Sequence, residues 1–153
     1  MSYEKFVEEY LSKAFLKKQK TSFLSVEKLI NRSLKDLKAA KANLTIDEGI
    51  AYTVAYLAML HAGRAFMFLK GFRPSDGYQH KTVVEFMSYS LGLEYKSIVE
   101  RFDRMRRKRN IFTYEVDVSI SKTEADSAFE IAVKFVDLIK EVIKKNPLAN
   151  IKF

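Results

Sequence analysis

Apolar residues recur three and four positions apart in one segment of this chain after another, and this spacing restricts the possible folds more than any other feature. It places apolar side chains on one side of an α-helix, and that side must be buried against another element. Glycine and proline are rare, with 5 and 2 residues among 153, so the composition argues against disorder. We predict helices over approximately 3–15, 22–43, 45–70, 79–91, 93 through the basic residues 104–109, and 121 to just before Pro147.

Local signals mark where several of these helices begin and end. Residues 45–48 and 121–124 have the capping-box pattern of Thr or Ser followed three positions later by Glu. Gly71 and Gly92 are placed to end the third and fourth helices. We predict a loop over 72–77, a short extended connection without sheet partners over 116–120, and a loose tail over 150–153. The predicted fold is all-α, an up-and-down bundle of five or six helices in a single domain over residues 1–153.

The composition restricts the classes of partner and cofactor. A net charge of +8 and a pI of about 9.5 favour an anionic partner, nucleic acid or nucleotide before membrane, although thermally stable basic proteins share this balance. The chain has no cysteine, and its two histidines, His61 and His80, are far apart in sequence. We therefore expect no metal site and no cofactor. Without an apolar signal core or a membrane span, we expect a cytoplasmic protein that does not bind membranes.

Residues 104–109 contain five cations in six positions, and one of them falls where a helix should carry an apolar residue. Arg109 continues the helical spacing of a series of apolar side chains: Ile98, Phe102 and Met105 before it, and Phe112 and Val116 after it. A charge on a buried face is costly unless it is paired. Arg109 is therefore predicted to lie in a functional site, an interface or a structural ion pair.

The other cations of this helix form a second set. Arg101, Arg104 and Lys108 share a face by spacings of 3 and 4, beside the face that holds Arg109. They form either a solvated stripe or a phosphate-contacting surface next to a pocket around Arg109 and Asn110. An arginine can bind phosphate through a bidentate fork, and an asparagine can position a ribose or a base edge.

The predicted third helix contains a comparable anomaly, because His61 and Arg64 interrupt an apolar stripe formed by Val54, Leu57 and Phe68. Each is either a core residue with a polar partner or part of a binding site. Tyr52 and Tyr56 lie one turn apart beside the stripe and either pack in the core or stack on bases. His80 begins the fourth helix, and we expect it to be an exposed polar residue, the alternative being a residue that lines a site. The chain has no P-loop, glycine-rich dinucleotide turn or HExxH motif.

Residues 51–65, AYTVAYLAMLHAGRA, resemble the AYYAMFHAARALL helix of HEPN-domain proteins. A Lys-Gly-Phe turn at 70–72, a loop ending in His80, and Arg109-Asn110 before Tyr114 follow in the order found in that family. The resemblance covers roughly residues 20–145 and is greatest to small stand-alone HEPN proteins. It implies a helical bundle that forms a homodimer, with the Arg-Asn segment of each subunit lining a shared cleft.

The resemblance also implies a range of functions. Many HEPN proteins are metal-independent endoribonucleases, several are toxins paired with a minimal nucleotidyltransferase antitoxin, and others bind nucleotides or partner such transferases. The active motif of the family is Arg, four to six residues, then His. Arg109 and Asn110 match its beginning, but Tyr114 occupies the position five residues on, with Thr113 and Glu115 beside it. A tyrosine with an ordinary pKa of about 10 can donate a proton at neutral pH but is a poor base.

We therefore predict a protein that binds RNA or a nucleotide, in a toxin–antitoxin or nucleotidyltransferase-linked system, with weak or absent ribonuclease activity. One alternative is an active metal-independent endoribonuclease that uses Tyr114 or His61. Another is a non-catalytic subunit of a nucleotidyltransferase, with Arg109 in a buried interface ion pair. Any catalytic group would comprise Arg109, Asn110 and Tyr114. The predicted binding residues are Arg101, Arg104, Lys108, Arg109, Asn110, His61, Arg64 and Tyr56.

Overall fold

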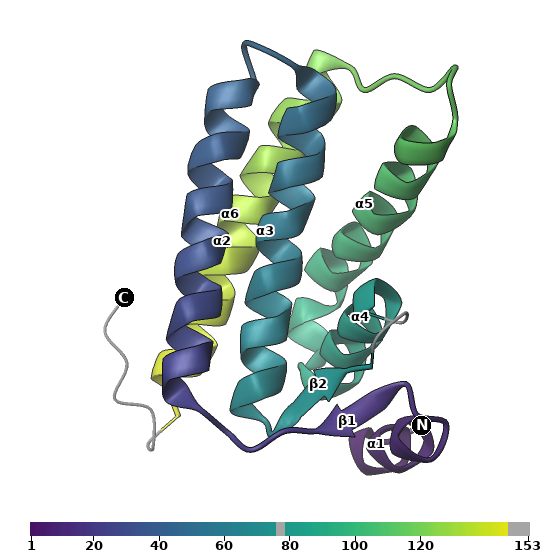
Figure 1. Ribbon diagram of the computed structural model, residues 1–153, viewed down its shortest axis with the longest axis vertical. Coiled ribbons are helices and arrows are strands. Elements are labelled where there is room, and N and C mark those ends of the chain that lie inside the picture. The colour runs from purple at the N-terminus through teal and green to yellow at the C-terminus, as the bar shows by residue number, and fades with distance from the viewer. Residues whose placement is uncertain (76–78, 147–153) are drawn as a thin grey trace.

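The computed structural model of the chain describes residues 1–75 and 79–146, and within them it is a helical bundle with one small β-ribbon (Figure 1). The all-α prediction is therefore confirmed. The elements are α1 (Tyr3–Ser12), β1 (Leu16–Lys18), α2 (Phe23–Asn43), α3 (Glu48–Leu69), β2 (Phe72–Pro74), α4 (Gln79–Ser90), the 3₁₀ turn η1 (Leu93–Tyr95), α5 (Lys96–Tyr114) and α6 (Lys122–Lys144). None of the helices in these ranges combines the length and apolar character needed to cross a membrane.

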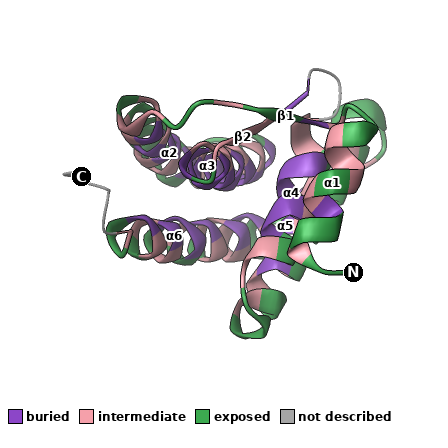
Figure 2. Cartoon of the chain, turned by 90° about the horizontal axis from the view of Figure 1, so that it is seen from below, coloured by how far each residue is buried: buried purple, intermediate pink, exposed green. Residues whose placement is uncertain are grey.

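Helix α3 is the centre of the bundle. Helices α2 and α6 pack along it on one side, and α4 and α5 pack against it on the other (Figures 1 and 2). Of its 22 residues, 14 are buried, and many of these are alanine or glycine, whose small size lets the neighbouring helices approach closely. The half-buried residues of α3 follow a stripe of spacing 3 and 4 that contains Val54, Leu57, His61, Arg64 and Phe68. The stripe that His61 and Arg64 interrupt is therefore the least buried part of α3.

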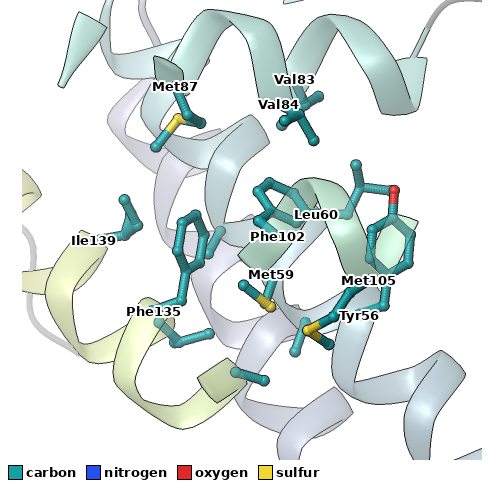
Figure 3. Close-up of a cluster of buried hydrophobic side chains, with 14 of the residues drawn as sticks. Tyr56, Met59, Leu60, Val83, Val84, Met87, Phe102, Met105, Phe135 and Ile139 are labelled. Carbon is teal, nitrogen blue, oxygen red and sulfur yellow. The ribbon is translucent and has the colours of Figure 1, made fainter. Parts of the chain in front are cut away.

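Side chains from four helices meet in one core, shown in Figure 3. Phe102 of α5 lies among residues of α3, α4 and α6, and its ring centroid is 5.1 Å from that of Phe135. Both phenylalanines are fully buried. Burial of one such side chain stabilises the fold by about 1.5–3 kcal/mol, so this core fixes α4 and α5 on α3.

Of the two capping boxes predicted from the sequence, one is present in the structure and the other is not. At α6 the box is confirmed, because Glu124 N–H donates to Ser121 Oγ at 3.1 Å and Ser121 N–H donates to Glu124 Oε1 at 3.2 Å. At α3 it is wrong: the cap is Asp47, whose carboxylate accepts from Ile50 N–H at 3.0 Å. The backbone carbonyl of Asn43 accepts from the N–H groups of Ile46 and Asp47, so the preceding residues form a turn.

A two-stranded antiparallel ribbon connects the start of the chain to the end of α3. Leu16 pairs with Pro74 and Lys18 with Phe72. The predicted loop is therefore wrong at 72–74, while its residues 76–77 lie outside the described residues, as does the predicted tail. The first helix is also shorter than predicted, because it ends at Ser12 and the chain turns at Ala14, which has a φ of 59°. A strand of three residues is too short to produce a recognisable alternation in the sequence.

Gly63 of α3 provides a test of how closely α4 packs on this helix. A Cβ atom at Gly63 would lie 2.6 Å from Cγ1 of the fully buried Val83. We expect Gly63→Ala to lower the free energy of unfolding by about 1 kcal/mol or more, because overpacking outweighs the roughly 1 kcal/mol by which alanine is favoured over glycine in a helix. Denaturant unfolding followed by circular dichroism measures the change.

Gly92→Ala is the matched control, since its Cβ would meet only the side chain of Glu94, at 3.8 Å. It should change the free energy of unfolding by less than about 0.5 kcal/mol. An equal effect of the two substitutions would contradict the close approach of α4 to α3.

Candidate nucleic-acid interface

An open groove of about 800 Å³ lies between the start of α4 and the C-terminal half of α5. We refer to it as the α4–α5 groove. No acidic side chain lines it within residues 1–75 and 79–146. Its lining residues are Gln79, His80, Lys81, Arg106, Arg109, Asn110 and Tyr114.

Arg109 lies half-buried at the edge of the apolar stripe of α5. Phe102 and Met105 are buried as predicted, but Val116 is 97% exposed, because α5 ends at Tyr114 and the stripe ends with it. The Nε atom of Arg109 is buried and has no hydrogen-bond partner among the described residues. One terminal nitrogen donates to Oδ1 of Asn110 at 3.2 Å. A buried donor without a partner costs free energy, so this guanidinium is suited to binding an anion.

The neighbouring arginines are held differently, because Asp103 accepts ion pairs from both of them. Its carboxylate is 3.0 Å from Arg106 and 2.8 Å from Arg107. The side chain of Arg106 is 16% exposed and lines the groove, whereas that of Arg107 is 63% exposed. The basic run therefore supplies two cations to the α4–α5 groove, Arg106 and Arg109. Of these two, Arg106 is paired with Asp103 and Arg109 is not.

The structure brings His80 into this groove, so the expectation of an exposed residue is wrong. Its Nδ1 is 2.8 Å from Oη of Tyr56, and the two rings are stacked with centroids 5.6 Å apart. Tyr56 is fully buried (Figure 3), and burial raises the pKa of its hydroxyl. A buried O–H needs an acceptor, so we assign Tyr56 as the donor and Nδ1 of His80 as the acceptor.

This assignment fixes the proton of a neutral His80 on Nε2. Burial lowers the pKa of His80 below its ordinary value, and Arg109 and Arg106 lower it further, followed by His61 and Arg64. At neutral pH the imidazole is therefore uncharged and presents an N–H donor. The sequence feature that could have predicted this position of His80 is Tyr56, because a tyrosine packed in the core needs a hydrogen-bond partner from another element for its hydroxyl.

The remaining predicted residues of α5 divide between two sides of the helix. Tyr114, the last residue of α5, lines the end of the α4–α5 groove and is 79% exposed. Arg101, Arg104 and Lys108 instead line a separate groove against α6, together with Tyr52. Arg101 donates to Oγ of Ser127 at 2.9 Å, and Lys108 is 3.4 Å from Glu124. These cations share one face as predicted, but part of their charge is engaged with α6.

His61 and Arg64 line a third groove, between α2 and α3. Nδ1 of His61 is 2.6 Å from a carboxylate oxygen of Asp36. The Nε atom of Arg64 is buried without a hydrogen-bond partner among the described residues. The predicted binding residues therefore lie in three grooves, with Tyr56 in the core beneath His80.

Among the residues that the structure describes, no group of three or more His, Cys, Asp or Glu side chains is arranged to hold a metal ion. The chemistry of the α4–α5 groove consists of hydrogen-bond donors and positive charge.

The environment of His80 predicts its titration. We expect the imidazole of His80 to titrate below the ordinary pKa of about 6.5, because burial and the nearby Arg109 disfavour its charged form. With two histidines in the chain, proton NMR follows the titration of His80, and His80→Asn assigns its signals. Arg109→Gln should raise the pKa of His80 part of the way back, whereas Arg107→Gln should leave it unchanged. Titration at or above the ordinary value would contradict the described environment.

Comparison with known proteins gives the family. The family model of the HEPN domain matches residues 26–142, a span that begins in α2, ends in α6 and includes the lining residues of all three grooves. No curated protein matches the chain. Because the family model matches well over half of the sequence and the fold is a helical bundle, the chain belongs to the HEPN family.

Proposed function

We propose that this HEPN protein binds RNA or a nucleotide in the α4–α5 groove, with Arg109 as its principal phosphate contact. The HEPN domain is associated with functions that involve nucleotides or RNA. The single observation that carries the proposal is the buried Nε of Arg109, which has no hydrogen-bond partner among the described residues and lies in a groove lined by further cations. A phosphate oxygen would supply the missing acceptor.

The neighbouring side chains suit the same ligand. His80 presents an Nε2–H, Asn110 an amide and Lys81 an ammonium group, so several donors face one groove. Tyr114 offers an exposed aromatic ring and a hydroxyl at the end of the groove. Aromatic side chains of this kind stack on bases with little sequence preference. The groove therefore combines phosphate contacts with a surface for a base.

The proposal includes the setting of the protein. We propose a homodimer that belongs to a toxin–antitoxin or nucleotidyltransferase-linked system, with weak or absent ribonuclease activity. Apolar side chains exposed around the start of α3 and the end of α5 support a protein–protein contact there: Ile46, Ile50, Ile111, Tyr114 and Val116. These two ends are adjacent, since Phe112 lies directly against Gly49.

Arg109→Gln tests the binding function. We expect the substitution to weaken the binding of labelled single-stranded RNA by roughly tenfold to a hundredfold, the value of a lost charge-assisted hydrogen bond. A filter-binding titration measures the affinity, and the melting temperature should change little. Arg107→Gln is the matched control, because it removes the same charge from an exposed position of the same helix. Equal affinities of the two variants would reject Arg109 as the phosphate contact.

A second candidate function is metal-independent RNA cleavage with His80 in place of the motif histidine. The observation that favours it is that His80 and Arg109 line the same groove, whereas His61 lines another and is bound by Asp36. Cleavage requires a base that accepts the proton of the 2′-hydroxyl and an acid that protonates the leaving 5′-oxygen. To act as the base, Nε2 of His80 would have to lose its proton, and Nδ1 would then become a donor to Tyr56.

Incubation of labelled RNA with the protein and EDTA separates the two candidates. Because the Tyr56 hydroxyl opposes the basic form of His80, we expect little or no cleavage by the unmodified protein. Substantial cleavage that disappears in both His80→Asn and Arg109→Gln would establish the ribonuclease instead. Cleavage that survives both substitutions would come from a contaminating enzyme, and the binding function would stand.

A further inference from the structure

The groove between α2 and α3 has the features of a second anion site. Its volume is about 570 Å³, and it lies on the half-buried stripe of α3. Three cations of α2, spaced by 4 and 3, turn toward it, together with two polar residues of α3. They are Lys28, Arg32, Lys35, His61 and Arg64.

A buried carboxylate orders this groove. The side chain of Asp36 is 12% exposed, and its two oxygens lie 2.6 Å from Nδ1 of His61 and 3.6 Å from Nε of Arg32. Since a carboxylate only accepts, Nδ1 of His61 must be the donor. The ring is thereby held in one orientation, and Nε2 remains as an acceptor for a donor group of a ligand in the groove. Asp36 is a positioning residue, and His61 is the side chain that it presents.

The charge balance of the groove favours an anion. Four permanent cations line it, namely Lys28, Arg32, Lys35 and Arg64, and the carboxylate of Asp36 offsets only one of them. Burial lowers the pKa of Arg64, and the like charge of Arg73 lowers it further. The buried Nε of Arg64 also has no hydrogen-bond partner in the described part of the chain. A bound anion would relieve the repulsion and supply the missing acceptor.

We propose that the α2–α3 groove is a second phosphate-binding site, in which Arg64 contacts the phosphate and the cations of α2 surround it. Nε2 of His61 accepts a hydrogen bond from a ribose hydroxyl of the same nucleotide. The phosphate belongs either to a free nucleotide or to a strand of RNA. The strand is favoured, because one helix, α3, lines this groove and also carries Tyr56, which binds His80 in the α4–α5 groove. Both grooves therefore adjoin α3, and a sufficiently long strand would contact both. This last step rests on the proposed function of the α4–α5 groove.

Paired lysine substitutions on α2 test the site. Lys28→Gln with Lys35→Gln removes two exposed cations of the groove and leaves the contacts of Asp36 in place. Lys38→Gln with Lys41→Gln removes the same charge from exposed positions of the same helix outside the groove. The probes are uridine monophosphate and single-stranded oligouridylates of increasing length. The affinity of each oligomer for the protein of residues 1–153 is measured by fluorescence anisotropy, and that of the monophosphate by displacement of a labelled oligomer.

The groove pair should weaken the binding of the longer oligomers about tenfold more than the control pair. It should also reduce the slope of the logarithm of their affinity against the logarithm of the salt concentration, by the amount expected for about one phosphate contact. If the affinity falls only for the long oligomers, the phosphate belongs to an RNA strand. If it falls equally for the monophosphate, the phosphate belongs to a free nucleotide. Indistinguishable effects of the two pairs at every length would overturn the second site. Failure of the proposed function is a separate result, since it appears as unchanged binding by Arg109→Gln.

Asp36→Asn tests the positioning role. It preserves the shape of the side chain but replaces the carboxylate with an amide that can present a donor to Nδ1. We expect weaker oligouridylate binding together with a shift of His61 from the Nδ1–H toward the Nε2–H tautomer, read from its ring-nitrogen NMR shifts. Loss of binding with the His61 tautomer unchanged would show that Asp36 does not act through His61, and would overturn its assignment.

Discussion

The burial of α3 against four other helices is the constraint on which the rest of the structure depends. Most of this helix is apolar or small, so its neighbours can cover it without leaving polar groups unsatisfied. Its polar exceptions include Tyr56, His61 and Arg64. The hydroxyl of Tyr56 and the ring of His61 each obtain a partner from another helix, whereas the buried Nε of Arg64 has none in the described part of the chain. Since a buried polar group without a partner costs about 1–3 kcal/mol, these two contacts help to determine where α2 and α4 lie along α3.

The same contacts determine where the ligand-binding chemistry can occur. His80 is drawn into the α4–α5 groove by Tyr56, and Asp36 holds His61 in the α2–α3 groove. Each histidine thus has one nitrogen engaged with the interior and one left for a ligand. Cations gather around both, and in each groove one arginine, Arg64 or Arg109, has a buried Nε without a hydrogen-bond partner in the described part of the chain.

The sequence predicted the helices well, because helical periodicity is a local property that one segment reveals by itself. It missed the β1–β2 ribbon, since the pairing of Leu16 with Pro74 joins distant short segments. The stripe through His61 and Arg64 was interpreted as an apolar face interrupted by polar residues. On a helix covered by neighbours, the polar positions instead mark the least buried edge. Spacing alone correctly separated Arg109 from the face of Arg101, Arg104 and Lys108, but it could not bring His80 to Arg109, because that proximity depends on how α4 packs against α5.

The direction of the Tyr56–His80 hydrogen bond links the fold to the chemistry of the groove. With the hydroxyl of Tyr56 as the donor, this buried O–H has its acceptor in Nδ1 of His80. The Nε2–H of His80 then faces the ligand as a donor, as do the groups of Arg109 and Asn110 in the same groove. Such a set of groups is complementary to phosphate oxygens. A base at His80 would require the opposite direction of this bond, and the buried hydroxyl of Tyr56 would then need another acceptor. The packing that positions His80 in the groove therefore also favours binding over cleavage.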